Sequence, residues 1–383
     1  MEQNKSNLFC PMPWVGMYYN ISRGSVCCVN SLRYKSPAEI RSAAEVEQIR
    51  SDLLNNIRNP SCQVCWHQED NNNKSMRDYY LMHLPDDVSN ISQTGDLQYL
   101  ELRVDNLCNF GCRICSPEAS SLLQNELNEH NTLKPYYGYI IDSPITATNK
   151  IDEVHWNEIL SLIPTLTNLQ LTGGEPMLVK RFYDLLDYLI ENNYSKNISL
   201  QITTNCSVLN PLIINRLEQF KKVFIVGSID AVMDVAEYQR YGTQWADVEN
   251  NCVEYAKLKN VTFVISSTLT AYTVLDLSKL ANFYMELKSL NNNVNWLVNL
   301  VLHKPQLDPT ILPVELRQRA IYELKDSINK VKGLDIEKQL IAILETIQTV
   351  DNSNRFDDFV AFTKDHDKVR NQSFEKTFGC KLY

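Results

Sequence analysis

The chain contains 383 residues, enough for a catalytic domain and a smaller module, since single domains usually take about 100 to 250 residues. Its formal net charge of -9 gives no general attraction to phosphate backbones or anionic lipids, which argues against nucleic acid and membranes as partners. Residues 1–9 are polar and no run of about 18 apolar residues occurs, which predicts a soluble, cytoplasmic protein.

Cysteine is the most unevenly distributed residue type in this sequence. Of 11 cysteines, most fall in the first third of the chain. A cytoplasmic protein keeps its thiols reduced, so a disulfide framework is not expected and the clustering indicates metal binding. The clustered residues are Cys10, Cys27, Cys28, Cys62, Cys65, Cys108, Cys112 and Cys115, whereas Cys206, Cys252 and Cys380 are scattered.

The N-terminal segment alternates aromatic or β-branched residues with polar ones over residues 9–30. The alternation is broken at residues 22–24 by Ser-Arg-Gly, a sequence typical of a turn. We therefore predict a β-hairpin whose returning strand carries Cys27 and Cys28.

Residues 38–58 place apolar side chains at helical spacing and are followed by Asn59-Pro60, which predicts one helix. Residues 85–97 are rich in Asp, Ser, Asn and Gly, so we predict a linker there. The segment before it, residues 1–90, is predicted to be a small cysteine-rich α+β module.

Residues 91–305 alternate short β-prone segments with helical patterns. Such βα repeats require parallel strands with helical crossovers, and they predict an α/β fold, an open partial (β/α)6 barrel related to the TIM barrel. In such folds the loops at the carboxyl ends of the strands carry the active site. The predicted strands are 99–104, 167–171, 198–203, 223–229, 261–268 and 296–302, and one predicted helix buries Phe182, Leu185, Leu186, Leu189 and Ile190.

Two segments lie outside this repeat. The connection 116–166 is unusually long, and loops of such length tend to be functional or mobile. Residues 306–383 are predicted to form a helical C-terminal extension that packs on the outside of the domain. The apolar face of this extension is predicted from Leu334, Leu340, Ile341, Leu344 and Ile347.

The loop after the first predicted barrel strand carries Cys108, Cys112 and Cys115, spaced Cys-x3-Cys-x2-Cys. Three thiolates on one short loop indicate a soft-metal site and leave a fourth ligand position open. Together with the Gly-Gly-Glu-Pro sequence at 173–176 after the second strand, this pattern resembles the radical S-adenosylmethionine (SAM) superfamily. A zinc knuckle is the alternative for the three cysteines.

The resemblance implies a [4Fe-4S] cluster held by the three thiolates and chelated at its fourth iron by SAM. It implies reductive cleavage of SAM to methionine and a 5'-deoxyadenosyl radical, which abstracts a hydrogen atom from the substrate. Flavodoxin or ferredoxin would be a suitable electron donor. No side chain is assigned a catalytic role.

The resemblance also implies a set of residues that bind SAM. Glycines allow close approach of the backbone, a glutamate can accept from the SAM ammonium group, and an arginine can pair with its carboxylate. For Ser228 and Asp230 an ordinary helix cap is the alternative, and for Arg240 a surface salt bridge. The implied residues are Gly173, Gly174, Glu175, Pro176, Thr204, Asn205, Ser228, Asp230 and Arg240.

Two positions depart from the pattern of the superfamily. Ile114 stands where an aromatic residue usually precedes the third cysteine, and Cys206 stands where a glycine usually follows Thr-Asn. The packing of adenine is therefore expected to differ in detail. We expect Cys206 to be a small apolar filler, not a ligand.

The N-terminal cysteines resemble the small modules of radical SAM maturases of the SPASM and twitch type, which hold an auxiliary iron-sulfur cluster. The expected ligands of an auxiliary [4Fe-4S] cluster are Cys10, Cys62, Cys65 and one residue of the neighbouring pair. We prefer Cys28 to Cys27, because neighbours on a strand point to opposite faces. Four thiolates suit zinc equally well, so zinc is the alternative.

The resemblance implies an enzyme that modifies a ribosomally made peptide or a protein. Modification of a nucleotide, sugar or other small metabolite is the alternative substrate class. A non-catalytic iron-sulfur or zinc protein is a third interpretation. The sequence does not choose between reaction outcomes, and it does not give the oligomeric state.

Overall fold

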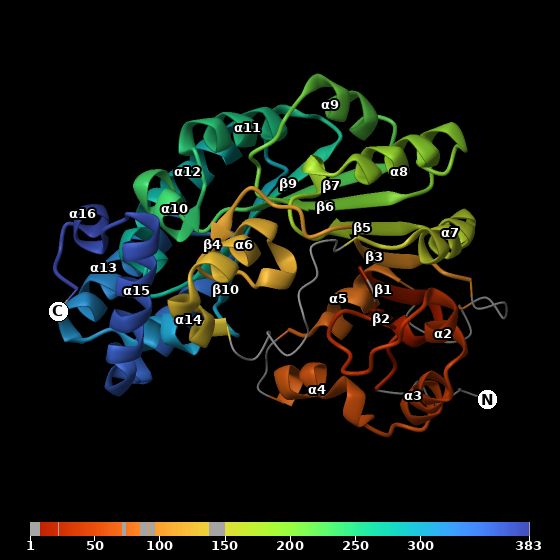
Figure 1. The fold of residues 1–383 in the computed structure, drawn as a ribbon, viewed down its shortest axis with the longest axis horizontal. Coiled ribbons are helices and arrows are strands. Elements are labelled where there is room, and N and C mark those ends of the chain that lie inside the picture. The colour runs from red at the N-terminus through yellow and green to blue at the C-terminus, as the bar shows by residue number, and fades with distance from the viewer. Residues whose placement is uncertain are drawn as a thin grey trace. The chain divides into compact units, whose positions relative to one another are not determined.

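Figure 1 shows the fold in a computed structural model. The structure describes residues 8–21, 23–70, 74–84, 91, 96–137 and 150–382. No helix among these residues is long and apolar enough to cross a membrane. The chain divides into two compact units: the first comprises Met1–Asp105, Ala147–Ile202 and Asn215–Lys222, and the second comprises Asn106–Thr146, Thr203–Ile214 and Val223–Tyr383.

The central element is an eight-stranded sheet in the order β10-β9-β7-β6-β5-β3-β1-β2. Within it, β3 pairs with β5 and β5 with β6 in parallel, and β7 pairs with β9 and β9 with β10 in parallel. The predicted α/β barrel-type fold is thus confirmed. Its six predicted strands are β3 (Tyr99–Arg103), β5 (Asn168–Thr172), β6 (Ser199–Thr204), β7 (Lys222–Ser228), β9 (Val261–Leu269) and β10 (Val294–Leu300).

Helices follow the strands as a βα repeat requires. The best example of the predicted pattern is α8 (Lys180–Glu191), which buries Phe182, Leu185, Leu186 and Leu189 and leaves Ile190 half-buried. The other helices of the repeat are α7 (Glu153–Leu162), α9 (Pro211–Leu217), α10 (Met233–Gln239), α11 (Trp245–Lys257) and α12 (Leu277–Leu290).

The predicted N-terminal hairpin is present as β1 (Gly16–Asn20) and β2 (Arg23–Ser25). Its strand β1 also pairs in parallel with β3, so the hairpin extends the main sheet. The prediction that the returning strand carries Cys27 and Cys28 is wrong, because β2 ends at Ser25 and both cysteines lie in the turn that follows. Strand alternation therefore does not decide which of them faces a metal.

The helix predicted over residues 38–58 is two helices, α2 (Pro37–Ser42) and α3 (Ala44–Leu54). They are separated by Ala43, whose extended backbone (ψ 137°) interrupts the helical hydrogen bonds. The second helix ends before Asn56, which has a positive φ of 56°. The remaining helices of this region are α1 (Met12–Val15), α4 (Gln63–Asp70) and α5 (Met76–His83).

The C-terminal region is helical, as predicted. Of the five residues predicted to form its apolar face, Leu340 and Ile347 are fully buried, whereas Ile341 is 38% exposed and was assigned wrongly. The predicted linker 85–97 lies mostly outside the described residues. The helices are α13 (Val314–Lys330), α14 (Asp335–Thr349), α15 (Phe356–Arg370) and α16 (Phe374–Phe378), and α6 (Ser121–Glu129) lies in the long connection after β3.

Candidate functional site

The loop with Cys108, Cys112 and Cys115 belongs to the second unit and is fixed by a short strand pair. Strand β4 (Gly111–Cys112) pairs with β8 (Arg240–Tyr241), which places Cys112 opposite Arg240. The backbone N–H of Cys115 donates to the carbonyl of Cys112 at 3.0 Å, closing a turn between the second and third cysteines. Cys112 therefore lies within a strand pair, whereas Cys108 and Cys115 lie before and after that pair in the chain.

Hydrogen-bond donors point at two of the three sulfur atoms. The Sγ of Cys108 accepts from the backbone N–H of Phe110 at 3.4 Å and from Asn205 Nδ2 at 3.9 Å. The Sγ of Cys112 accepts from Arg240 Nη1 at 3.6 Å. Burial raises the pKa of the Cys112 thiol to about 12, and Arg240 opposes that rise. Donors of this kind stabilise thiolates and tune iron-sulfur clusters, so the donor set fits the implied group.

Arg240 is held in place by a buried ion pair. Its Nε lies 2.9 Å from Oδ2 of Asp230, and their side chains are 13% and 1% exposed. The other carboxylate oxygen of Asp230 accepts from the backbone N–H of Thr268 at 2.8 Å. Burial lowers the pKa of Arg240, but Asp230 and Cys112 outweigh it and the net pKa is raised. This burial excludes the alternative of a surface salt bridge for Arg240.

Asn205 connects the end of β6 to the cysteine loop. Its Nδ2 donates to Asn109 Oδ1 at 3.0 Å, and its Oδ1 accepts from the backbone N–H of Ser207 at 2.9 Å. The hydroxyl of Thr204 accepts from the backbone N–H of Cys206 at 3.0 Å. Ser228 is the half-buried last residue of β7. The structure thus gives Thr204 and Asn205 structural contacts, and their predicted contacts with SAM stay predictions.

Cys206 has a positive φ of 60° and is fully buried. Left-handed backbone conformations favour glycine, so this geometry explains why a glycine is expected at the position. A Cβ added at Gly227 would lie 3.0 Å from the sulfur of Cys206. The side chain therefore fills space against a neighbouring strand, in agreement with the predicted role of a filler.

The Gly-Gly-Glu-Pro segment belongs to the first unit. Gly173 has φ 137°, and a Cβ there would lie 2.6 Å from the carbonyl oxygen of Asp105, so only glycine fits. The N–H of Gly174 donates to the same oxygen at 3.0 Å. Glu175 is fully buried and its Oε1 accepts from the N–H of Met177 at 3.1 Å, next to Pro176. Glycine is therefore required at position 173 because the carbonyl oxygen of Asp105 lies close to it. From the sequence alone, this glycine is instead explained by the approach of a ligand.

Sequence reasoning missed Arg113, which lies between the second and third cysteines. Arg113 is fully buried; its Nη2 contacts Oδ1 of Asp367 at 2.7 Å and its Nε donates to the carbonyl of Tyr238 at 3.0 Å. The guanidinium carbon also lies 4.0 Å from the ring centroid of Tyr238. A charged residue inside a buried cysteine motif was the signal that could have revealed this anchor.

Helix α15 makes further contacts with the segment around the cysteine loop. Arg370 donates from Nε and Nη2 to both carboxylate oxygens of Glu126, at 2.8 and 2.7 Å. The Nε2 of His366 lies 3.1 Å from the hydroxyl of Tyr137. Helix α15 of the predicted C-terminal extension therefore also packs against the segment that carries the cysteine loop. Asp367 and Arg370, three residues apart, share a helix face and reach the loop together.

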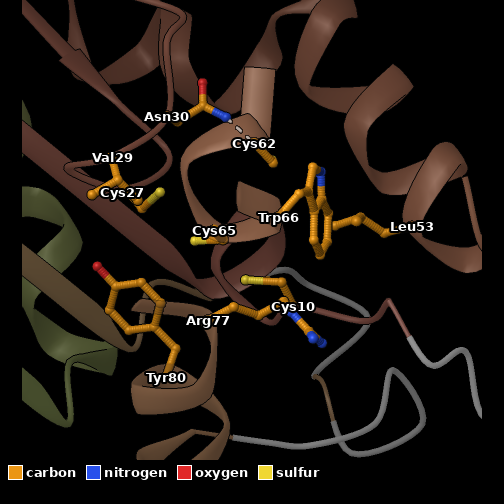
Figure 2. Close-up of a pocket in the computed structure, with 10 residues that line it drawn as sticks. All are labelled: Cys10, Cys27, Val29, Asn30, Leu53, Cys62, Cys65, Trp66, Arg77 and Tyr80. Carbon is orange, nitrogen blue, oxygen red and sulfur yellow. Dashed lines mark hydrogen bonds between the residues drawn. The ribbon is translucent and has the colours of Figure 1, made fainter. Parts of the chain in front are cut away.

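Figure 2 shows a second cysteine site, which lies in the first unit. Cys10, Cys27, Cys62 and Cys65 line one cavity together with Trp66. The cavity contains about 330 Å³ not filled by protein atoms, part of it open to solvent. Burial raises the pKa of all four thiols. A bound metal would deprotonate such thiols outright.

The structure corrects the choice of Cys28. Cys28 does not line the cavity; its Sγ lies 3.6 Å from the hydroxyl of Tyr80, and it also interacts with Glu101. Burial and the charges of the other three cavity cysteines raise the pKa of Cys27. Cys27 and not Cys28 therefore faces the other candidate ligands.

Polar side chains contact the cavity cysteines and their neighbours in the chain. The Nδ2 of Asn30 donates to the sulfur of Cys62 at 3.6 Å. Arg77 contacts Glu69 at 2.6 Å and donates to the carbonyl of Phe9 at 3.1 Å, next to Cys10. Among the described residues, no three His, Cys, Asp or Glu side chains are arranged to share one metal ion. This holds for the four cysteines of the cavity and for Cys108, Cys112 and Cys115 alike.

Residues 104–283 match the model of the radical SAM superfamily. No curated protein matches the chain.

Several solved structures resemble the chain. Native anSMEcpe with bound AdoMet and the Cp18Cys peptide is 17% identical with a TM-score of 0.40, covering 61% of this chain and 58% of that chain. SuiB from Streptococcus suis bound to S-adenosylmethionine is 15% identical with a TM-score of 0.41, covering 77% and 60%. The match thus spans less than two thirds of the length of each of these two proteins.

We predict that Arg113→Met lowers the free energy of unfolding by about 3 kcal/mol, because it leaves the carboxylate of Asp367 without its buried partner. Urea denaturation of the full chain measures the change. The matched control is Arg355→Met, which removes an exposed pair with Asp358 and is expected to cost less than about 1 kcal/mol. Equal losses for the two variants would contradict an anchoring role for Arg113.

Proposed function

We propose that this protein, a member of the radical SAM superfamily, is a radical SAM enzyme that modifies a peptide or a protein. The observation that carries the proposal is the loop of Cys108, Cys112 and Cys115 within the matched segment, with N–H donors aimed at its sulfur atoms. When bound there, a [4Fe-4S] cluster supplies the electron that cleaves SAM and so generates the radical that abstracts a hydrogen atom.

The chain's own residues position that cluster. Phe110 and Asn205 donate toward the sulfur of Cys108, and Arg240 donates toward the sulfur of Cys112. Asp230 fixes Arg240, so the positive charge stays beside the thiolate. These donors offset the negative charge of the thiolates in a buried site, where an uncompensated charge would be costly.

By the superfamily resemblance, we assign SAM binding to residues at the carboxyl ends of the strands. Arg240 remains suited to the SAM carboxylate, because a guanidinium group has five N–H donors and Asp230 and Cys112 do not use all of them. Glu175 is assigned to the SAM ammonium group. The remaining assigned residues are Gly173, Gly174, Pro176, Thr204, Asn205, Ser228 and Asp230.

We assign an auxiliary [4Fe-4S] cluster to the cavity lined by Cys10, Cys27, Cys62 and Cys65. A single zinc ion would draw four sulfur atoms to about 2.3 Å from one point. What supports a cluster here is the resemblance of this module to those of radical SAM maturases, which hold an auxiliary iron-sulfur cluster. Zinc remains the outcome that would overturn this assignment.

The peptide substrate is supported by the resemblance of this cysteine module to those of radical SAM maturases. A small metabolite such as a sugar or nucleotide is the alternative substrate. A reducing compartment such as the cytoplasm is the proposed location, because it would keep the 11 cysteines available to bind metal. Flavodoxin or ferredoxin is the proposed electron donor.

The reconstituted protein, reduced with dithionite, is expected to convert SAM to 5'-deoxyadenosine, measured by liquid chromatography. Cys108→Ala is expected to lose this activity, because it removes one of three cluster ligands. Cys380→Ala, which changes a cysteine remote in sequence from the loop, is the control expected to keep it. If the parent protein forms no more product than Cys108→Ala, the proposed activity is wrong.

The auxiliary site is tested by metal analysis in a variant with Cys108, Cys112 and Cys115 all changed to Ala. About four irons per chain are expected to remain, as one [4Fe-4S] cluster requires. A further Cys27→Ala change is expected to remove most of this iron, whereas Cys28→Ala is expected to retain it. One zinc per chain, or the reverse order of the two variants, would contradict the assignment.

A further inference from the structure

Three polar side chains stand side by side at the carboxyl ends of neighbouring strands in the first unit. Asn20 ends β1, Arg103 ends β3 and Thr172 ends β5. Asn20 is in register with Arg103, and Arg103 is in register with Thr172. Because these strands are parallel and in register, the three side chains lie on one face and at one edge of the sheet. We call them the strand-end row.

The face that carries the row is not the face packed against α7. Tyr19, whose side chain points the opposite way from Asn20, contacts His155 of α7 at 3.0 Å. On the row's face, α5 covers the strands nearer their starts. The ring of Tyr80 lies 5.2 Å from that of Tyr99, the first residue of β3. Tyr99 is four residues before Arg103, at the other end of β3.

Each member of the row has a buried polar atom with no hydrogen-bond partner among the described residues. These atoms are Oδ1 of Asn20, Nε of Arg103 and Oγ1 of Thr172. Leaving a buried polar atom unpaired is costly, and native structures contain few such atoms. Three on adjacent strands, in one row, are therefore expected to meet a ligand.

The charge of Arg103 is also uncompensated by an ion pair within the part of the chain that the structure describes. Glu101 lies two residues earlier on the same face. Burial raises the pKa of Glu101 and the charge of Arg103 opposes that rise, but the Glu101 carboxyl group hydrogen-bonds with Cys28 and forms no ion pair with Arg103 among the described residues. The aliphatic stem of Arg103 runs close to Gly173, where a Cβ would lie 3.2 Å from its Cγ. Backbone packing therefore confines the side chain. Its guanidinium group has no ion-pair partner among the described residues and could bind an anion.

We propose that the strand-end row binds a carboxylate of the peptide substrate together with a neighbouring amide N–H. Arg103 supplies charge-assisted N–H donors to the carboxylate, Thr172 donates its hydroxyl to the same group, and Asn20 Oδ1 accepts from the amide. An acidic residue or the C-terminal residue of a peptide presents both groups on nearby atoms. The inference rests on the proposed function, and it specifies the chemistry of its substrate.

The methionyl end of SAM also combines a carboxylate with N–H groups, so the test must separate the two sources. The probes are fluorescein-labelled pentaglycine with a free C-terminal carboxylate and the same peptide with a C-terminal carboxamide. Binding of each to the reconstituted full chain in the presence of SAM is measured by fluorescence polarisation. Affinity for SAM is measured separately by equilibrium dialysis. These measurements require no turnover, so their failure is distinguishable from failure of the proposed activity.

The parent protein is expected to bind the carboxylate probe about tenfold or more tightly than the carboxamide, in line with the strength of hydrogen bonds to charged groups. Arg103→Gln is expected to abolish this preference. Arg216→Gln is the control expected to keep it, because Arg216 pairs with Asp187 outside the row. A preference that is absent in the parent or retained in Arg103→Gln overturns the proposal. An equal loss of SAM affinity in Arg103→Gln also overturns it, in favour of SAM as the ligand.

Asn20→Asp distinguishes loss of binding from loss of folding. The substitution places a carboxylate beside Arg103 and satisfies its charge within the chain, so thermal stability is expected to equal or exceed that of the parent. The internal carboxylate competes with the ligand, so the preference for the carboxylate probe is expected to disappear. A stable Asn20→Asp variant that retains the parent's preference would overturn the proposal.

Discussion

Two buried arginines on either side of Cys112 determine where the cysteine loop lies. Arg240 faces Cys112 across a strand pair and is paired with Asp230. Arg113, next in sequence to Cys112, is paired with Asp367 of α15. Burying two guanidinium groups is costly unless each has a carboxylate and further acceptors. Both have them, so the loop is fixed by interactions that tolerate little displacement.

Close backbone contact reinforces this arrangement. Gly242 has φ 99°, and a Cβ there would lie 2.6 Å from the carbonyl oxygen of Asn109 in the cysteine loop. Only glycine combines that conformation with that proximity. The loop is thus held by the ion pairs of Arg113 and Arg240 and by the close backbone contact at Gly242. A set of ligands for a large cofactor must be held in place in this way.

The first unit links its two candidate sites through one turn. Cys27 faces the cavity of the N-terminal cysteines, and its neighbour Cys28 contacts Tyr80 and Glu101. Glu101 lies on the same strand face as Arg103, two residues before it. Cys28 and Glu101 thus connect the turn beside the cavity to the strand face that carries the row.

Much of the fold could be predicted because its signals are local. The six parallel strands and the face of α8 follow from hydrophobic periodicity, and the cysteine loop follows from spacing. The errors concern where an element ends and which residues distant in sequence it contacts. Alternation along a strand could not assign Cys27, because the strand ends at Ser25. Nor could the amphipathic pattern of α15 show that Asp367 meets Arg113, 254 residues away.

The central claim is that the Cys108 loop holds a cluster with a position open to SAM. Electron paramagnetic resonance of the dithionite-reduced, reconstituted protein tests it most directly. We predict that adding SAM changes the spectrum of one reduced cluster, and that Cys108→Ala shows no SAM-dependent change. An identical spectrum with and without SAM in the parent protein would contradict it.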